Sequence, residues 1–160
     1  MRETSTHIYF WGSYLSQWYK SLFTDNNILF NTAEQYMMFH KALLFGDVEI
    51  AEQILSEKQP SKQKELGKQV KNFDVDIWVK NREIIVINGN LLKFTQNQDL
   101  KELLLSTGTK ILVEGSPQDR IWGVGLHYED DLILDESNWK GLNLLGKCLM
   151  EVRNKLNPTT

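Results

Sequence analysis

Glu34 and Lys41 are the two side chains of this 160-residue chain whose types and spacing point most directly to chemistry. Both fall in residues 31–45, a segment whose apolar residues surround a predicted helix and leave it no polar face. Such a helix is usually buried, and a buried charge is costly unless it is paired or functional. Seven residues make about two turns, so the carboxylate and the amine would project from one side, roughly 10 Å apart. A carboxylate and an amine facing one space suggest a reactive site.

Each of these two residues also has a purely structural interpretation. Asn31 is a good N-cap, and it would make Glu34 the third helical residue and the acidic partner of a capping box. Lys41 has a stem long enough to carry its ammonium group to the surface. From this segment alone, the structural and the catalytic interpretations both stay open.

A second group of unusual residues lies in the predicted loop after a short strand, within residues 112–126. Asp119 could serve as an acid or base or hold ribose hydroxyls, and Arg120 could pair with a phosphate. Trp122 offers a flat face for a base or sugar, and Gly123 would let a ligand approach the backbone. The alternative is a surface loop with its tryptophan against the core and an ion pair between the aspartate and the arginine.

Three further polar or aromatic residues sit at positions that favour binding or structure. Trp78 and Arg82 are four residues apart in a predicted helix, hence on one face. Trp78 is more often a core residue than a stacking platform, whereas Arg82 on an apolar stretch needs an internal carboxylate or a ligand phosphate. Asn143 is most simply the N-cap of the last helix.

The elements that must position these residues are many helices around a small sheet. Residues 75–94 contain an Ile-Ile-Val-Ile run that favours a strand, but apolar spacings of three and four predict a helix. We expect a mainly helical α+β fold with a small β-sheet, in a single domain over residues 1–160. The other predicted helices cover residues 32–45, 47–55, 60–70, 98–106 and 143–156. The predicted strands are 7–11 and 110–114, with a hairpin of 22–24 and 28–30.

Composition narrows the possible functions. The formal net charge of -3 argues against a strong electrostatic grip on nucleic acid, although a local basic patch remains compatible with it. One cysteine, Cys148, permits no internal disulfide, which fits a cytoplasmic location, and we expect it in the core. No apolar run reaches membrane-spanning length. The three histidines lack metal-ligand spacing, and there is no phosphate-binding P-loop, so we expect neither a metal nor a cofactor.

The chain resembles the NADAR family, also called YbiA-like, from about residue 8 to residue 156. The combination of the Glu34 helix, the Asp119 loop and the Asn143 segment is specific. The residues that carry the resemblance are Phe30-Asn-Thr-Ala-Glu-Gln-Tyr-Met-Met38, Lys41-Ala42, Gly67-Lys68, Trp78, Arg82, Lys93-Phe94, Asn97, Leu112-Val-Glu114, Asp119, Trp122-Gly123, Gly141, Asn143-Leu-Leu-Gly146 and Leu149-Met150.

The resemblance implies a compact α+β fold and hydrolysis of N-glycosidic bonds between ribose and a base or amine. It implies that Glu34 is the acid/base carboxylate and that Lys41 captures the anomeric carbon as a Schiff base. Asp119 joins them as a catalytic candidate. The binding candidates are Trp78, Arg82, Trp122, Gly123 and Asn143.

Three functional hypotheses follow from the resemblance. The first is removal of ADP-ribose from guanine, in a nucleotide or in DNA. The second is cleavage of phosphoribosylated pyrimidine intermediates of riboflavin synthesis. The third is a module that binds NAD or ADP-ribose without cleaving it, against which the retained carboxylate and amine count.

Overall fold

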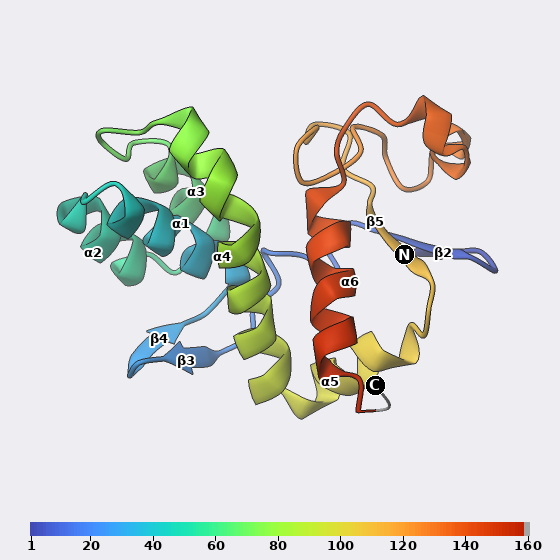
Figure 1. The fold of residues 1–160 in the computed structure, drawn as a ribbon, viewed down its shortest axis with the longest axis horizontal. Coiled ribbons are helices and arrows are strands. Elements are labelled where there is room, and N and C mark those ends of the chain that lie inside the picture. Colours follow the sequence, from blue (N-terminus) through green and yellow to red (C-terminus); the bar gives the residue numbers. More distant parts are fainter. Residues whose placement is uncertain (159–160) are drawn as a thin grey trace. The chain divides into compact units, whose positions relative to one another are not determined.

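The computed structural model describes residues 1–158 and confirms the mainly helical α+β class. The chain forms two compact units, one of residues 17–97 and one that combines residues 1–16 with the chain from residue 98 onward. In Figure 1, residues 17–97 run from blue through cyan and green to yellow-green, whereas the other unit combines dark blue strands with yellow to red segments. Within the described residues, no helix is long and apolar enough to cross a membrane.

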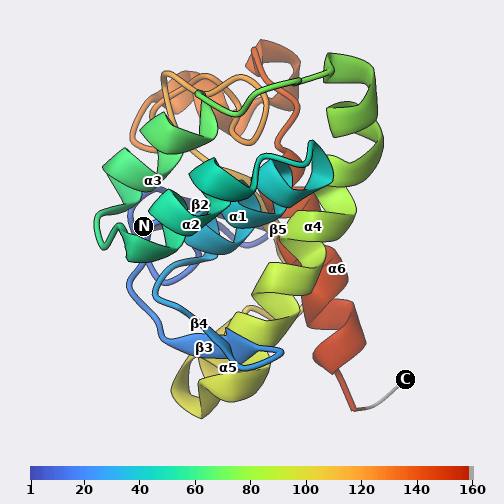
Figure 2. The same ribbon diagram turned by 90° about the vertical axis from the view of Figure 1, so that its left-hand side faces the viewer.

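The unit of residues 17–97 begins with the predicted hairpin. Strands β3 (Phe23–Asp25) and β4 (Ile28–Phe30) pair antiparallel around Asn26 and Asn27. Both asparagines have positive φ, 49° and 67°, which is the conformation that a tight two-residue hairpin turn requires. Figure 2 shows this hairpin below the helices of its unit.

Four helices complete this unit. They are α1 (Ala33–Leu44), α2 (Val48–Ser56), α3 (Pro60–Gly67) and α4 (Val75–Gln96), and α1 packs against the other three. The side chains of Asp47 and Asp74 cap α2 and α4, and Pro60 opens α3, as its fixed φ favours. The helix predicted to reach Val70 ends at Gly67, whereas the long helix over the isoleucine run is confirmed.

Glycines let two of these helices approach α1 closely. A Cβ on Gly89 of α4 would lie 2.5 Å from the ring of Tyr36, and one on Gly67 of α3 would overlap the side chain of Met38. These contacts fix α1 at the centre of its unit.

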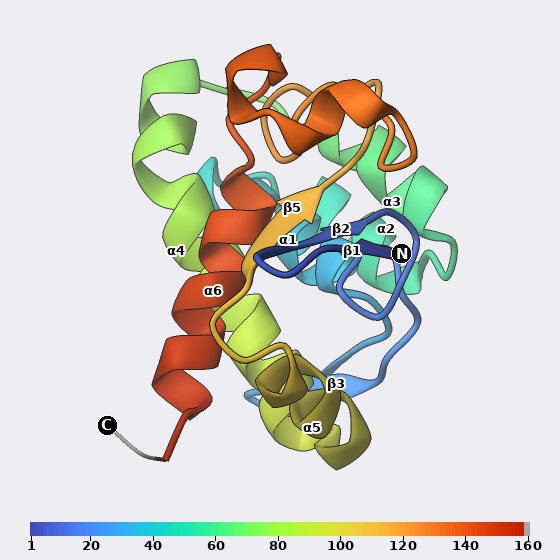
Figure 3. The same cartoon turned by 90° about the vertical axis from the view of Figure 1, so that its right-hand side faces the viewer.

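The other unit is a three-stranded sheet with two helices. Strands β1 (Arg2–Glu3), β2 (His7–Phe10) and β5 (Ile111–Glu114) lie in the order β1-β2-β5, with β2 and β5 parallel. Helix α6 (Leu144–Leu156) contacts β5 and α5 (Gln98–Ser106), and Figure 3 shows α6 beside β5. Strand β1 was not predicted. Two short 3-10 helices, η1 (Asp131–Leu134) and η2 (Glu136–Asn138), precede α6.

A cluster of five buried residues supports the sheet and the loop that follows it. Its members are Tyr9, Val113, Val124, Leu126 and Ile133. Cys148 is also buried, as predicted.

Candidate active site

The predicted site residues are divided between the two units. Glu34 and Lys41 lie on α1, and Trp78 and Arg82 lie on α4, all in the unit of residues 17–97. Asp119, Trp122, Gly123 and Asn143 belong to the other unit.

The N-terminus of α1 is capped by other residues than those predicted. Thr32 is the N-cap, because its Oγ1 accepts a hydrogen bond of 3.0 Å from the backbone N–H of Gln35. Oε1 of Gln35 in turn accepts from the N–H of Asn31, at 2.8 Å. The predicted cap at Asn31 is therefore wrong, since Asn31 lies one residue too early and its Nδ2 donates to Lys58 O instead. Gln35 takes the capping-box position that the sequence assigned to Glu34.

Glu34 is held in the interior through its backbone. Only 4% of the residue is exposed. Its N–H donates to the carbonyl of Gln17 at 2.9 Å, and the side chain of Gln17 accepts a 2.8 Å hydrogen bond from Asn90 Nδ2 on α4. A buried carboxylate that does not cap its own helix fits a functional role better than the structural alternative.

The Lys41 amine lies against two aromatic rings. Its Nζ is 4.7 Å from the ring centroid of Phe73 and 5.5 Å from that of Trp78. Burial lowers the pKa of this amine from its usual value, and the negative charge of Glu34 opposes the shift. The two residues lie seven positions apart on one continuous helix, so they share a face as predicted. Lys41 is therefore half-buried, with its amine against aromatic rings.

Phe73 was missed by sequence reasoning. It lies in the connection before α4, it is 46% exposed, and its ring contacts that of Phe45 at 5.3 Å between centroids. No periodicity or motif marks this position, because its approach to Lys41 arises only when α1 and α4 pack together.

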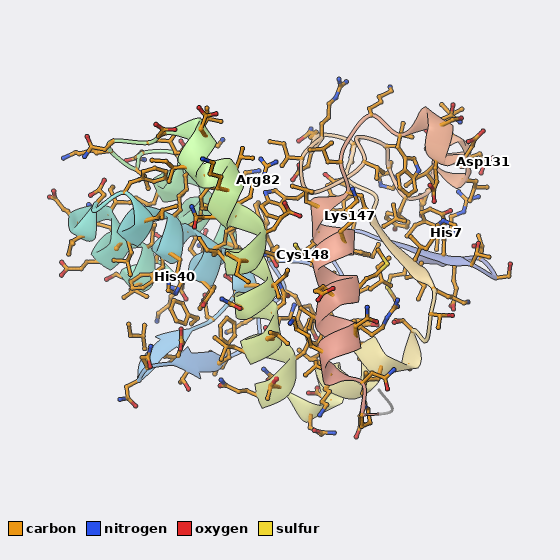
Figure 4. All side chains as sticks on the ribbon, viewed as in Figure 1. His7, His40, Arg82, Asp131, Lys147 and Cys148 are labelled. Atoms are coloured by element: carbon orange, nitrogen blue, oxygen red, sulfur yellow. The ribbon has the colours of Figure 1, made fainter. Side chains whose placement is uncertain are left out.

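Arg82 offers an unused donor beside this aromatic pair. Trp78 is buried, with 9% exposed, while Arg82 is half-buried one turn further along α4 (Figure 4). The buried Nε of Arg82 has no hydrogen-bond partner among the described residues, and no described carboxylate lies within ion-pair distance. Of the two partners expected for Arg82, an internal carboxylate is therefore absent from the part of the chain that the structure covers.

In the other unit, Asp119 organises its own loop. One carboxylate oxygen, Oδ1, accepts hydrogen bonds of 2.9 Å from the N–H groups of Ile121 and Trp122. Within residues 1–158, Asp119 forms no ion pair with Arg120. A Cβ on Gly123 would lie 3.0 Å from two carbonyl oxygens, so this glycine permits close backbone packing.

Asn143 joins β5 to the start of α6. Asn143 occupies the N-cap position of α6, as predicted, but its backbone is left-handed, with φ of 52°, and its side chain makes no capping hydrogen bond. The side chain instead accepts from Glu114 N and donates to Leu112 O, both at 3.0 Å. These two bonds satisfy backbone groups of β5, which is why the amide is unavailable to its own helix.

Two further basic groups of residues 17–97 have lowered pKa values, the fully buried Lys93 and the half-buried His40. Lys93 is fully buried on α4, near the rings of Phe94 and Tyr19, and burial lowers its pKa to about 7. His40 extends from α1 toward the hairpin, 4.3 Å from the ring centroid of Tyr36, and burial lowers its pKa (Figure 4). The His40 ring thus packs among the aromatic side chains Phe30, Tyr36 and Phe39. No described group of three His, Cys, Asp or Glu side chains is arranged to hold a metal.

Comparisons with known proteins match this arrangement to one family. The family model described as the NADAR domain matches residues 9–157. The chain is 43% identical over 166 residues to N-glycosidase R617 of Acanthamoeba polyphaga mimivirus, covering 96% of this chain and 98% of that protein. It is 29% identical to maize riboflavin biosynthesis protein PYRR over 78% of this chain and 19% of that one. The NMR structure of Escherichia coli YbiA superposes with a TM-score of 0.77 at 26% identity, covering 97% of this chain and 87% of that chain.

Proposed function

The chain belongs to the NADAR domain family, which includes proteins named N-glycosidases, and from that premise we propose that it hydrolyses the N-glycosidic bond between ADP-ribose and guanine. The observation that carries this proposal is the half-buried Lys41 amine beside the rings of Phe73 and Trp78, with a lowered pKa, on the same helix face as the buried Glu34. The finer choice of ADP-ribosyl guanine as substrate rests on the resemblance of the segment Thr32-Ala-Glu-Gln-Tyr-Met-Met38.

In the proposed reaction, Glu34 assists the first step, which is cleavage of the N-glycosidic bond. An N-glycosidic bond breaks through a cation-like sugar, which a nearby carboxylate stabilises electrostatically. The same carboxyl group can protonate the leaving base. Because the residue is buried, its charge acts through a medium of low dielectric constant, where it is stronger than in water.

In the second step, Lys41 captures the anomeric carbon of the ribose. Burial raises the fraction of neutral amine, and a neutral amine is the nucleophile. Nζ captures the cation-like anomeric carbon as the base leaves, and the new amine adduct loses a proton. The ring carbon–oxygen bond at that carbon then breaks, the ring oxygen takes up a proton, and a Schiff base forms. Addition of water then breaks the carbon–nitrogen bond, which releases ADP-ribose and restores the amine. The alternative is direct displacement by water, with Glu34 as the base and Lys41 holding a phosphate or hydroxyl.

The remaining residues are proposed to bind the substrate. Arg82 lacks a described carboxylate partner and suits a phosphate. Trp78 lies beside the Lys41 amine and suits the sugar or base. Trp122, Gly123 and Asn143 keep the binding roles that the resemblance implies. A net charge of -3 favours a modified nucleotide or a single displaced base over a long stretch of duplex DNA.

The name of the maize relative favours a second candidate function. PYRR is named a riboflavin biosynthesis protein, so phosphoribosylated pyrimidine intermediates are the alternative substrates. The chemistry at Glu34 and Lys41 would be the same, and only the released sugar phosphate would differ. A third candidate, binding of NAD or ADP-ribose without cleavage, does not require a half-buried amine beside a carboxylate.

Reductive trapping tests substrate and mechanism together. The protein is incubated with an ADP-ribosylated guanine oligonucleotide and cyanoborohydride, and the intact protein mass is measured. We expect an adduct of ADP-ribose on the wild type and on Lys80→Ala, an exposed lysine on α4, but not on Lys41→Ala. Cleavage without an adduct, or near-native cleavage by Lys41→Ala, would eliminate the Schiff base. If the oligonucleotide stays intact, the same trap on phosphoribosylated pyrimidines tests the alternative, and failure there would favour the binding module.

A further inference from the structure

A buried pair of amide side chains joins α4 to the start of α1. Nδ2 of Asn90 donates to Oε1 of Gln17 at 2.8 Å, and it also donates to the carbonyl of Val86, one turn earlier on α4, at 2.9 Å. The backbone carbonyl of Gln17 in turn accepts a 2.9 Å hydrogen bond from the N–H of Glu34. Asn90 on α4 is therefore connected to the proposed acid/base residue through a single intervening residue.

This amide pair is enclosed, but its hydrogen bonding is incomplete. Asn90 is fully buried, and Gln17 is 7% exposed. Within residues 1–158, the buried Nε2 of Gln17 and Oδ1 of Asn90 have no hydrogen-bond partner. A buried polar atom without a partner lowers stability, and two apolar side chains of the same shape often stabilise a protein equally well or better. Stability alone is therefore a poor explanation for two amides at this place.

The amide pair differs in kind from the other contacts between α1 and α4. Near the start of α4, Nζ of Lys41 lies 5.5 Å from the ring centroid of Trp78. Further along α4, the absence of a side chain on Gly89 makes room for the ring of Tyr36. Contacts with ring faces tolerate small displacements, whereas a hydrogen bond weakens steeply when its angle changes. Of these three contacts, the amide pair is the one that specifies a single position of α4 along α1.

We propose that Asn90 is a positioning residue, which fixes through Gln17 where α4 lies relative to the start of α1 and so aligns the substrate with Glu34. The substrate-binding candidates on α4 are Trp78 and Arg82 (Figure 4). The proposal rests on the proposed function, because alignment matters only if these side chains hold the substrate. Misplacing a substrate by about 1 Å can lower the rate about 10²-fold.

Two substitutions remove the contact, one from each side. Asn90→Leu removes the donor, and Gln17→Met removes the side-chain acceptor but keeps the backbone carbonyl that binds the N–H of Glu34. We expect each to lower the free energy of unfolding, because one amide stays buried, and to lower kcat/KM on the ADP-ribosylated guanine oligonucleotide about 10²-fold. Asn81→Leu is the matched control. Nδ2 of Asn81 makes the same bond one turn back on α4, to Ile77 O at 2.8 Å, so this variant should keep the wild-type kcat/KM.

The double variant separates positioning from stability. Gln17→Met combined with Asn90→Leu leaves neither amide buried alone, so the free energy of unfolding in urea should recover to above that of both single variants. Its kcat/KM should stay about 10²-fold below that of the wild type, because no hydrogen bond then fixes the position of α4. Recovery of kcat/KM together with stability would show that the pair only stabilises the fold, and it would overturn the proposal. Wild-type kcat/KM in either single variant would do the same.

A measurement without substrate distinguishes failure of this proposal from failure of the proposed function. The pKa of Lys41 is followed by NMR in protein with ¹³C-labelled lysine. Burial is the main cause of the lowered pKa of Lys41, so looser packing of α4 on α1 should raise it in the double variant, but not in Asn81→Leu. If the wild type cleaves no ribosylated substrate, the proposed function fails, and this pKa still tests the position of α4. An unchanged pKa in the double variant would then overturn the positioning role.

Discussion

At the scale of single residues, Lys41 is subject to opposing influences on its protonation. Burial disfavours the ammonium form, whereas the charge of Glu34 favours it. The faces of Phe73 and Trp78 also attract a cation. The lowered pKa means that burial prevails, so at a given pH a larger fraction of this amine is neutral than of a free lysine. The aromatic rings therefore act mainly by excluding water.

Phe73 provides a direct test of this balance. Phe73→Ala would admit water to the amine, raise the pKa of Lys41 and shift the rising limb of the pH–activity profile to higher pH. Phe73→Leu keeps the apolar cover and removes the aromatic face. We therefore expect the rising limb of its pH–activity profile to lie at the same pH as that of the wild type, or at a lower pH. The measurement is kcat/KM against pH for the three proteins. Identical profiles would show that Phe73 does not control the amine.

Asp119 and Glu34 can be separated by isosteric amides. Oδ1 of Asp119 holds two backbone N–H groups, and an asparagine keeps that acceptor. We therefore expect Asp119→Asn to retain most activity and Asp119→Ala to lose it together with the loop. Glu34→Gln should lower kcat by about 10²- to 10⁴-fold, the usual contribution of an acid or base. If the kcat of Asp119→Asn instead fell as far as that of Glu34→Gln, Asp119 would be the proton donor.

Sequence reasoning singled out Glu34 and Lys41 as the proposed reactive pair, but it did not predict the residues around them. Glu34 and Lys41 stood out because one helical period places two charges on an apolar helix, and that is local information. Phe73 and the partnerless Nε of Arg82 depend on how α1, α4 and the connection before α4 pack. Asn143 was placed correctly at the start of α6, but its side chain serves β5, a contact that no local pattern encodes.

At the scale of elements, the start of α1 shows how a small shift in register changes the meaning of a residue. Asn31 and Thr32 are both acceptable caps, and the sequence alone favoured the first. The structure uses Thr32, and its hydroxyl also donates to Oε1 of Gln63 at 2.7 Å. The shift of one residue makes Gln35, not Glu34, the third helical residue. Glu34 therefore does not hold the capping-box position that the sequence assigned to it.

A stability comparison tests this assignment of roles. Thr32→Ala removes the cap and leaves the buried Gln63 without one partner, so it should lower the free energy of unfolding by about 1–2 kcal/mol or more. Glu34→Gln should cost clearly less, because the cap is unchanged. Urea denaturation followed by far-UV circular dichroism gives both values. Equal losses would mean that the Glu34 carboxylate is needed to start α1.

At the scale of the whole molecule, the fold class and the positions of the α-helices were predictable from the sequence, whereas the pairing of the strands was not. The predicted helices match the six α-helices of residues 1–158, because a helix is defined by neighbours along the chain, whereas η1 and η2 were not predicted. The parallel pairing of β2 with β5 joins His7 to Ile111, and strand β1 has only two residues. Contacts between segments so distant in sequence leave no periodic signal. The expectation of one domain over residues 1–160 stays a prediction.

Lys93 makes the stability of the whole molecule depend on pH. Burial lowers its pKa from 10.5 to about 7, so in the folded protein it is mostly neutral above pH 7. In the unfolded chain it stays protonated up to about pH 10. Between these values the unfolded state binds more protons, and Lys93 therefore makes stability rise with pH, by at most about 1.4 kcal/mol per unit. Below pH 7 both states are protonated, and this contribution no longer changes.

Lys93→Met should remove this dependence, because methionine has a similar volume and does not titrate. From pH 7 to pH 10, we expect the free energy of unfolding to increase more for the wild type than for the variant. Below pH 7, we expect the difference between the two free energies to stay constant. Lys80→Met, at an exposed position on the same helix, should follow the wild-type curve. Parallel curves for the wild type and Lys93→Met would mean that the buried amine keeps its proton throughout, held by polar neighbours in the interior.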